Sequence, residues 1–102
     1  MWVRDPRAER ITVRKPIFYR LAETAQFKLG VLLNISESGV LLECQSQIAP
    51  GQELEMLFEM PAEITGQLNH TVLSSGVVMR IAASGPGNSI GVKLSGYRFL
   101  SK

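Results

Sequence analysis

The sequence is poor in the residues from which disulfide frameworks, zinc sites and many catalytic centres are built. Its 102 residues include one cysteine, Cys44, and one histidine, His70. A single cysteine cannot form an internal disulfide, and one histidine leaves too few soft ligands for a zinc site. We therefore expect no metal site and no bound cofactor.

The sequence also lacks an apolar run of the roughly 20 residues that a membrane-spanning helix requires. Its start, MWVRDPRAER, has no apolar centre of the kind found in a secretion signal. With 45% hydrophobic and 20% charged residues, the chain can build a core and is expected to fold as one domain. These features predict a cytoplasmic protein that does not insert into a membrane.

Sequence motifs of common enzymes are missing as well. There is no phosphate-binding Walker sequence, no Gly-x-Ser-x-Gly and no His-Glu-x-x-His. His70 lies beside Asn69 without a recognisable nucleophile, so we interpret it as a surface residue. Cys44 ends an apolar run and is interpreted as a small buried hydrophobe. The protein is not expected to be an enzyme.

Short segments separated by glycine and proline predict an all-β fold. In residues Glu53–Met60, every second side chain is apolar, at positions 54, 56, 58 and 60. This is the period-two pattern of a strand with one buried face. Five further segments are rich in β-branched, leucine and aromatic residues. They are Ile11–Tyr19, Phe27–Ile35, Gly39–Cys44, Thr71–Ile81 and Ser89–Ser95. Six short strands predict an antiparallel barrel or sandwich.

The segments that connect the predicted strands also carry sequence signals. Turns are predicted at Ala49–Gly51 and Ser84–Ser89, while residues Met60–Gln67 fit either a helical turn or a loop. The tail after Ser95 is too short for an independent helix, and we expect its aromatic residues to cover one end of the barrel. We divide the chain into an arm at 1–10 and one barrel domain at 11–102.

Positive charge is concentrated at the N-terminal end. Residues 1–20 hold six basic and two acidic side chains, a net charge of +4, whereas the rest of the chain has a net charge of −2. This asymmetry predicts an anionic partner for the arm, and the alternative is an arm that is merely solvated. A barrel that binds single-stranded nucleic acid is disfavoured because Trp2 is the only aromatic residue near the arginines.

The segment Asn34-Ile-Ser-Glu-Ser-Gly39 lies between two predicted strands. On extended backbone, Asn34 and Ser36 point to one side, and Gly39 allows a flat group to approach the backbone or permits a positive φ angle. Such a turn can hold a ligand. In the alternative interpretation, its side chains bond only to their own backbone.

The arrangement as a whole resembles the PilZ domain family. The resemblance is carried by Arg10-Ile-Thr-Val-Arg-Lys-Pro-Ile-Phe-Tyr19, Asn34-x-Ser36-x-x-Gly39-Val-Leu-Leu, Ile48-Ala-Pro-Gly-Gln, Gly76-Val-Val-Met-Arg80 and Ile90-Gly-Val-Lys-Leu94. It implies a six-stranded antiparallel β-barrel of the split-barrel type. Many members bind cyclic di-GMP through an Arg-x-x-x-Arg arm and an Asp/Asn-x-Ser-x-x-Gly turn, and the turn motif is complete here.

The resemblance implies a role as a cyclic di-GMP receptor that relays the messenger to a motility, type IV pilus or exopolysaccharide system. The implied ligand-binding residues are Arg7, Arg10, Asn34, Ser36 and Gly39, with Arg4, Arg14 and Arg80 as further candidates. The position four before Arg10 is Pro6, so the arm departs from the family spacing. The alternative is therefore an adaptor that acts through protein contacts without the nucleotide, as a monomer or homodimer.

Overall fold

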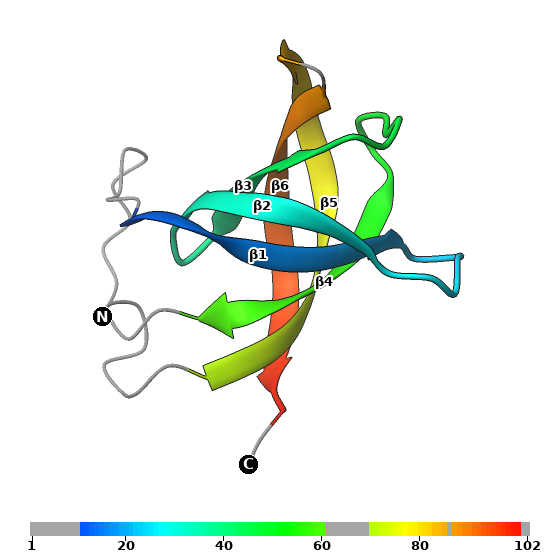
Figure 1. Cartoon of the computed structure of the whole chain (residues 1–102). Coiled ribbons are helices and arrows are strands. Elements are labelled where there is room, and N and C mark those ends of the chain that lie inside the picture. The colour runs from blue at the N-terminus through cyan, green and yellow to red at the C-terminus, as the bar shows by residue number, and fades with distance from the viewer. Residues whose placement is uncertain (1–10, 61–69, 86, 101–102) are drawn as a thin grey trace.

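The computed structural model describes residues 11–60, 70–85 and 87–100. Within these ranges the chain forms a closed antiparallel barrel of six strands in the order β1-β2-β3-β6-β5-β4 (Figure 1). The strands are β1 (Ile11–Leu21), β2 (Lys28–Ile35), β3 (Gly39–Cys44), β4 (Glu53–Met60), β5 (His70–Ser84) and β6 (Gly87–Phe99). The predicted six-stranded antiparallel barrel is confirmed.

Alternation along the strands produces the core. In β4, Leu54, Met56, Phe58 and Met60 are buried, whereas the residues between them are exposed or half-buried. Successive strand side chains point to opposite faces, so this pattern places every second residue inside the barrel. Burying each such side chain stabilises the fold by about 1.5–3 kcal/mol. The inward residues of the other strands complete one continuous apolar cluster.

The hairpin of β5 and β6 is longer than the sequence predicts. β5 continues to Ser84 and β6 runs from Gly87 to Phe99, with twelve paired positions between them. The turn predicted within residues 84–89 lies between Ser84 and Gly87, which pair with each other, and Gly85 has a φ of 59°. Residues 96–99 are part of a strand and not a tail laid over the barrel. A continuous ladder with β5 satisfies their backbone groups, which an irregular tail would leave to water.

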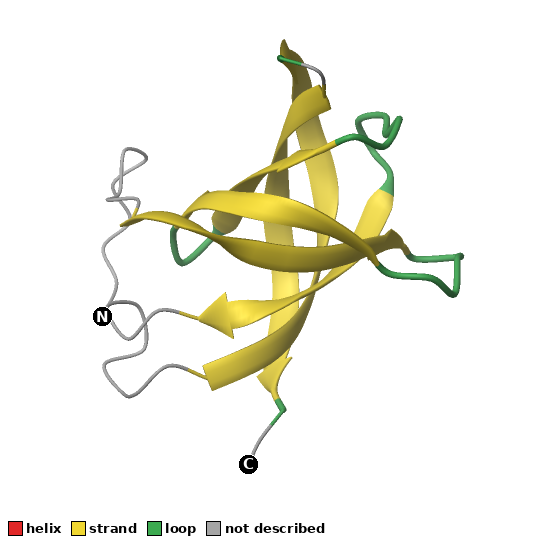
Figure 2. Cartoon of the chain, in the orientation of Figure 1, coloured by secondary structure: helices red, strands yellow, loops and turns green. Residues whose placement is uncertain are grey.

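The other turns agree with their sequence signals. Gly51 has a φ of 92°, and the amide of Gln52 donates to the carbonyl of Ala49 at 3.2 Å, which closes the predicted turn after Pro50. The uncertain segment at 61–69 and the arm at 1–10 lie outside the described residues. Figure 2 shows strands joined by loops throughout the described ranges. None of these ranges forms a helix that could span a membrane.

Candidate functional site

The turn between β2 and β3 is closed by its own hydrogen bonds. The amide of Ser36 donates to the carbonyl of Gly39 at 2.9 Å, and the Ser36 hydroxyl donates to the same carbonyl at 3.5 Å. The amide of Ser38 donates to the Ser36 hydroxyl at 3.4 Å. Ser36 is only 3% exposed. Its hydroxyl therefore supports the turn from the inside.

Gly39 is buried at the start of β3, and its role does not require a positive φ angle. Among the described residues, the glycines with positive φ are Gly51 and Gly85. The Cα of Gly39 pairs with that of Lys93 on β6, so the turn is placed against the middle of the neighbouring strand. The reason that rests on a positive φ angle therefore does not apply to Gly39.

A pocket of about 520 Å³ opens beside this turn, on the outer side of the barrel. Asn34, Ser38 and Gly39 line one side, while Arg80 and Lys93 line the other from β5 and β6. These residues are far apart in the sequence and meet because β3 pairs with β6 and β6 pairs with β5. We call this pocket the turn groove.

The turn groove combines positive charge with apolar surface. Its two cationic side chains, Arg80 and Lys93, are exposed, and no acidic side chain is found among the described residues that line it. Met79 adds a large apolar side chain that is 56% exposed. Cations within a few ångströms of an anion favour its binding, and apolar surface favours a flat ring. The groove therefore suits an anionic ligand that also presents apolar surface.

The side chain of Arg80 lies beside Gly91 of β6. A Cβ atom at position 91 would lie 3.4 Å from Cγ and 3.7 Å from Nε of Arg80, which is ordinary van der Waals contact. The Arg80 stem therefore lies close over the glycine backbone.

The sequence-predicted residues fall into three groups. Asn34 and Gly39 line the turn groove together with Arg80, whereas Ser36 lies behind the turn. Arg14 is exposed in the first part of β1 and is not among the lining residues. Arg4, Arg7 and Arg10 lie outside the described residues.

The arm joins the barrel next to the turn. Ile11, which follows the arm, pairs with Ile35, and Thr12 pairs with Asn34. Paired Cα atoms of antiparallel strands are about 4.5–5.5 Å apart. The end of the basic arm is therefore tied to the same strand position as the polar turn.

Sequence reasoning missed Lys93 as a site residue. The signal was present, because Lys93 stands between Val92 and Leu94, which are buried and half-buried, and so must point outward. What the sequence did not supply was the register that places Lys93 opposite Gly39.

A second pocket of about 720 Å³ lies at the far end of β2 and β3. Its lining includes Tyr19, Lys28, Glu43, Ser46 and Asn88, and none of the predicted ligand-binding residues. The hydroxyl groups of Tyr19 and Ser46 are 2.7 Å apart, and burial raises the pKa of the Tyr19 hydroxyl above its ordinary value. This pocket is larger than the turn groove, but no residue of the polar turn lines it.

Cys44 and His70, which the sequence analysis gave no catalytic role, both take part in packing. Cys44 is buried, as predicted. His70 is half-buried rather than a simple surface residue, and its ring packs against Phe99 with the ring centres 5.1 Å apart.

Comparisons with known proteins agree with this architecture. The model of the PilZ domain family matches residues 4–100. Among solved structures, the chain is similar to the Bacillus subtilis inhibitor of motility, MotI/DgrA, with a TM-score of 0.72 and 15% sequence identity. The match covers 92% of this chain and 44% of that chain, so this chain spans less than half of its length. No curated protein matches the sequence significantly.

Proposed function

Because the chain belongs to the PilZ domain family, we propose that it is a receptor module for the bacterial second messenger cyclic di-GMP, without catalytic activity of its own. The observation that carries the proposal is the turn groove, in which Asn34, Arg80 and Lys93 meet beside the attachment point of the basic arm.

The ligand chemistry matches these groups. Cyclic di-GMP carries two phosphates and two guanines. Arg80 and Lys93 pair with phosphate oxygens, and the carboxamide of Asn34 bonds to a guanine edge. Met79 and the neighbouring strand surface provide the apolar floor for a purine ring.

The arm supplies the remaining cations. Arg7 and Arg10, with Arg4 and Arg14 as further candidates, close over the ligand from the N-terminal side. A guanidinium donates two parallel bonds to guanine O6 and N7 and stacks on purine rings, which lysine does not do as well. Closure orders the arm around the ligand and changes the surface offered to a partner.

Ser36 and Gly39 hold the turn in the shape that the ligand meets. The Ser36 hydroxyl is bonded inside the turn, and Gly39 keeps the backbone at the groove free of a side chain. Pre-formed polar sites bind more tightly because less conformational entropy is lost on binding.

We place the module in the cytoplasm, upstream of a motility, type IV pilus or exopolysaccharide system. Motility is the first of these to test, because the similar structure is named as an inhibitor of motility. The output of such a module depends on the protein it contacts.

Isothermal titration of cyclic di-GMP into the purified chain tests the proposal. We expect saturable heat with the wild type and a loss of affinity of roughly 10- to 150-fold for Arg10→Ala and Arg80→Ala, since bonds to charged groups contribute about 1.5–3 kcal/mol. Arg98→Ala is the matched control, because Arg98 is an exposed arginine of β6 that does not line the groove. Absence of saturable heat from folded wild-type protein would reject the proposal.

A second candidate function is an adaptor that binds its partner without the nucleotide. It is favoured by one observation, the proline at position 6 where the family spacing has an arginine. In that case the titration gives no heat, and the affinity for an identified partner protein is the same with and without cyclic di-GMP.

A further inference from the structure

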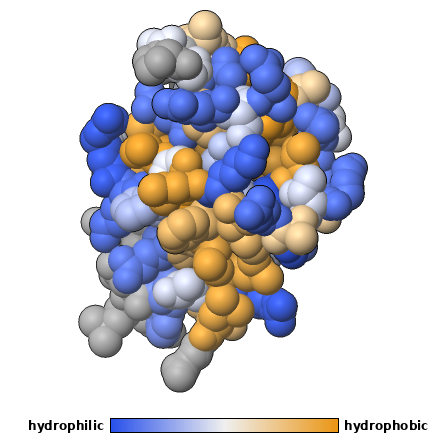
Figure 3. Space-filling view, turned by 45° about the vertical axis from the view of Figure 1, so that its right-hand side comes forward, coloured by the Kyte–Doolittle hydropathy of each residue, from blue (hydrophilic) through white to orange (hydrophobic). Residues whose placement is uncertain are grey.

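A row of apolar side chains runs around the outside of the barrel across four neighbouring strands. Phe18 of β1 pairs with Leu29 of β2 on one side and with Leu57 of β4 on the other, and Leu57 pairs with Leu73 of β5. Phe18 is 43% exposed and Leu29 is 63% exposed. We call these four residues the apolar row. Figure 3, which turns the right-hand side of Figure 1 forward, shows apolar side chains gathered in a band among polar ones.

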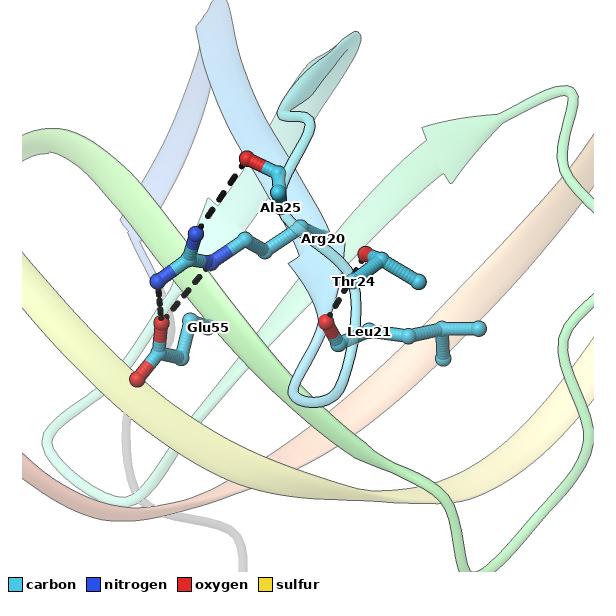
Figure 4. A network of polar contacts seen from close by, with 5 residues as sticks. All are labelled: Arg20, Leu21, Thr24, Ala25 and Glu55. Carbon is cyan, nitrogen blue, oxygen red and sulfur yellow. Dashed lines mark hydrogen bonds and ion pairs between the residues drawn. The ribbon is translucent and has the colours of Figure 1, made fainter.

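Ion pairs border the apolar row on both sides. Along the strands in one direction, Nε of Arg20 on β1 donates to Glu55 on β4 at 2.9 Å (Figure 4). In the other direction, Nζ of Lys15 on β1 lies 3.4 Å from Glu59 on β4. An apolar centre with a polar border is the composition of many protein interfaces.

The charges of the two ion pairs are divided between the two strands by sign. Both cations belong to β1 and both anions belong to β4, so positive and negative charge lie on opposite sides of the boundary between the two strands. The apolar residues are distributed evenly about the same boundary, with Leu29 and Phe18 on one side and Leu57 and Leu73 on the other.

A surface of this kind complements a copy of itself. Consider a two-fold axis that runs parallel to β1 and β4 and between them. It places Arg20 over Glu55 of the second copy and Lys15 over Glu59 of the second copy, while Phe18 meets Leu57 of the second copy. Every cation then faces an anion, and no like charges face each other. A two-fold interface requires this self-complementarity.

We infer that the face formed by β1 and β4 is the interface of a symmetric homodimer, with Phe18 and Leu57 at its centre. The two barrels meet along the outer faces of these two strands. The Arg20–Glu55 pairs of the two copies form an alternating cluster of four charges. No residue of the apolar row or of the two ion pairs lines the turn groove.

Complementary charge variants test the dimer. Sedimentation velocity over a concentration series should show self-association of the wild-type chain. Phe18→Lys and Leu57→Glu should each weaken it by about tenfold or more, as expected for a central interface residue. An equimolar mixture of the two variants should regain two-chain particles, since each F18K chain then faces an L57E chain. Ala83→Lys, at an exposed position near the β5–β6 turn and away from the row, is the matched control and should behave as the wild type.

A second measurement guards against misfolded variants. Phe18→Cys and Leu57→Cys introduce a thiol without adding charge, and their mixture should form a disulfide-linked heterodimer under mild oxidation faster than either variant alone. A wild-type chain that stays monomeric throughout the concentration series overturns the inference. So does failure of both the charge mixture and the cysteine mixture to restore pairing while circular dichroism shows folded barrels.

Discussion

Replacing Ser36 by alanine should destabilise the barrel in addition to weakening ligand binding. The Ser36 hydroxyl accepts from the amide of Ser38 at 3.4 Å and donates to the carbonyl of Gly39 at 3.5 Å, and the residue is 3% exposed. A hydrogen bond contributes a net 0.5–1.5 kcal/mol at roughly ideal geometry, and bonds of this length lie at the weak end. Together we assign them about 1 kcal/mol.

Urea and thermal unfolding measure this loss directly. About 1 kcal/mol corresponds to a fall in melting temperature of roughly 4–8 °C for a domain of this size. Ser38→Ala is the matched control, because it removes an exposed hydroxyl from the same turn and should change stability by less than about 0.5 kcal/mol. If Ser36→Ala is as stable as Ser38→Ala and yet loses cyclic di-GMP binding, the hydroxyl contacts the ligand and the reasoning is refuted.

Three further predictions concern the barrel itself. Gly76→Ala should lower the free energy of unfolding, measured in urea, by about 1–3 kcal/mol, because its Cβ would lie 2.6 Å from a backbone oxygen of β6. Gly96→Ala is the control: a Cβ there meets nothing within 4 Å, so its stability should be close to that of the wild type. Ser74→Ala should leave stability unchanged or raise it by up to about 1 kcal/mol, since the Ser74 hydroxyl is buried and has no hydrogen-bond partner among the described residues; a clear loss would contradict this. Burial raises the pKa of Tyr19 in the folded state, so the unfolded state loses its proton first and stability should fall as pH rises above about 10. Tyr19→Phe removes the hydroxyl and its bond to Ser46, so the stability of this variant should fall less steeply at alkaline pH. A decline as steep as that of the wild type would show that Tyr19 is not its cause.

The strands could be predicted from the sequence because their signals are local. Alternation in Glu53–Met60 reports burial directly, and the predicted bounds of that strand agree with β4. The ends of β5 and β6 were placed too early, since residues 96–99 carry no clear alternation and become strand only by pairing with β5. A hydrogen-bond ladder with a neighbour outweighs weak local propensity.

The candidate site was predictable only in part. Asn34 and Gly39 stand in a recognisable motif, whereas Lys93 joins them through the pairing of β3 with β6. The apolar row was also invisible, because Phe18, Leu57 and Leu73 each look like ordinary strand residues until the register aligns them.

The sequence by itself determined the all-β class, the basic arm and the polar turn, because alternation, charge and turn residues act over a few neighbouring positions. Only the tertiary structure decided which outward side chains share a surface. That choice depends on strand order and register, which are fixed by closing the barrel around a common core, and it brings together Gly39 with Lys93 and Phe18 with Leu57.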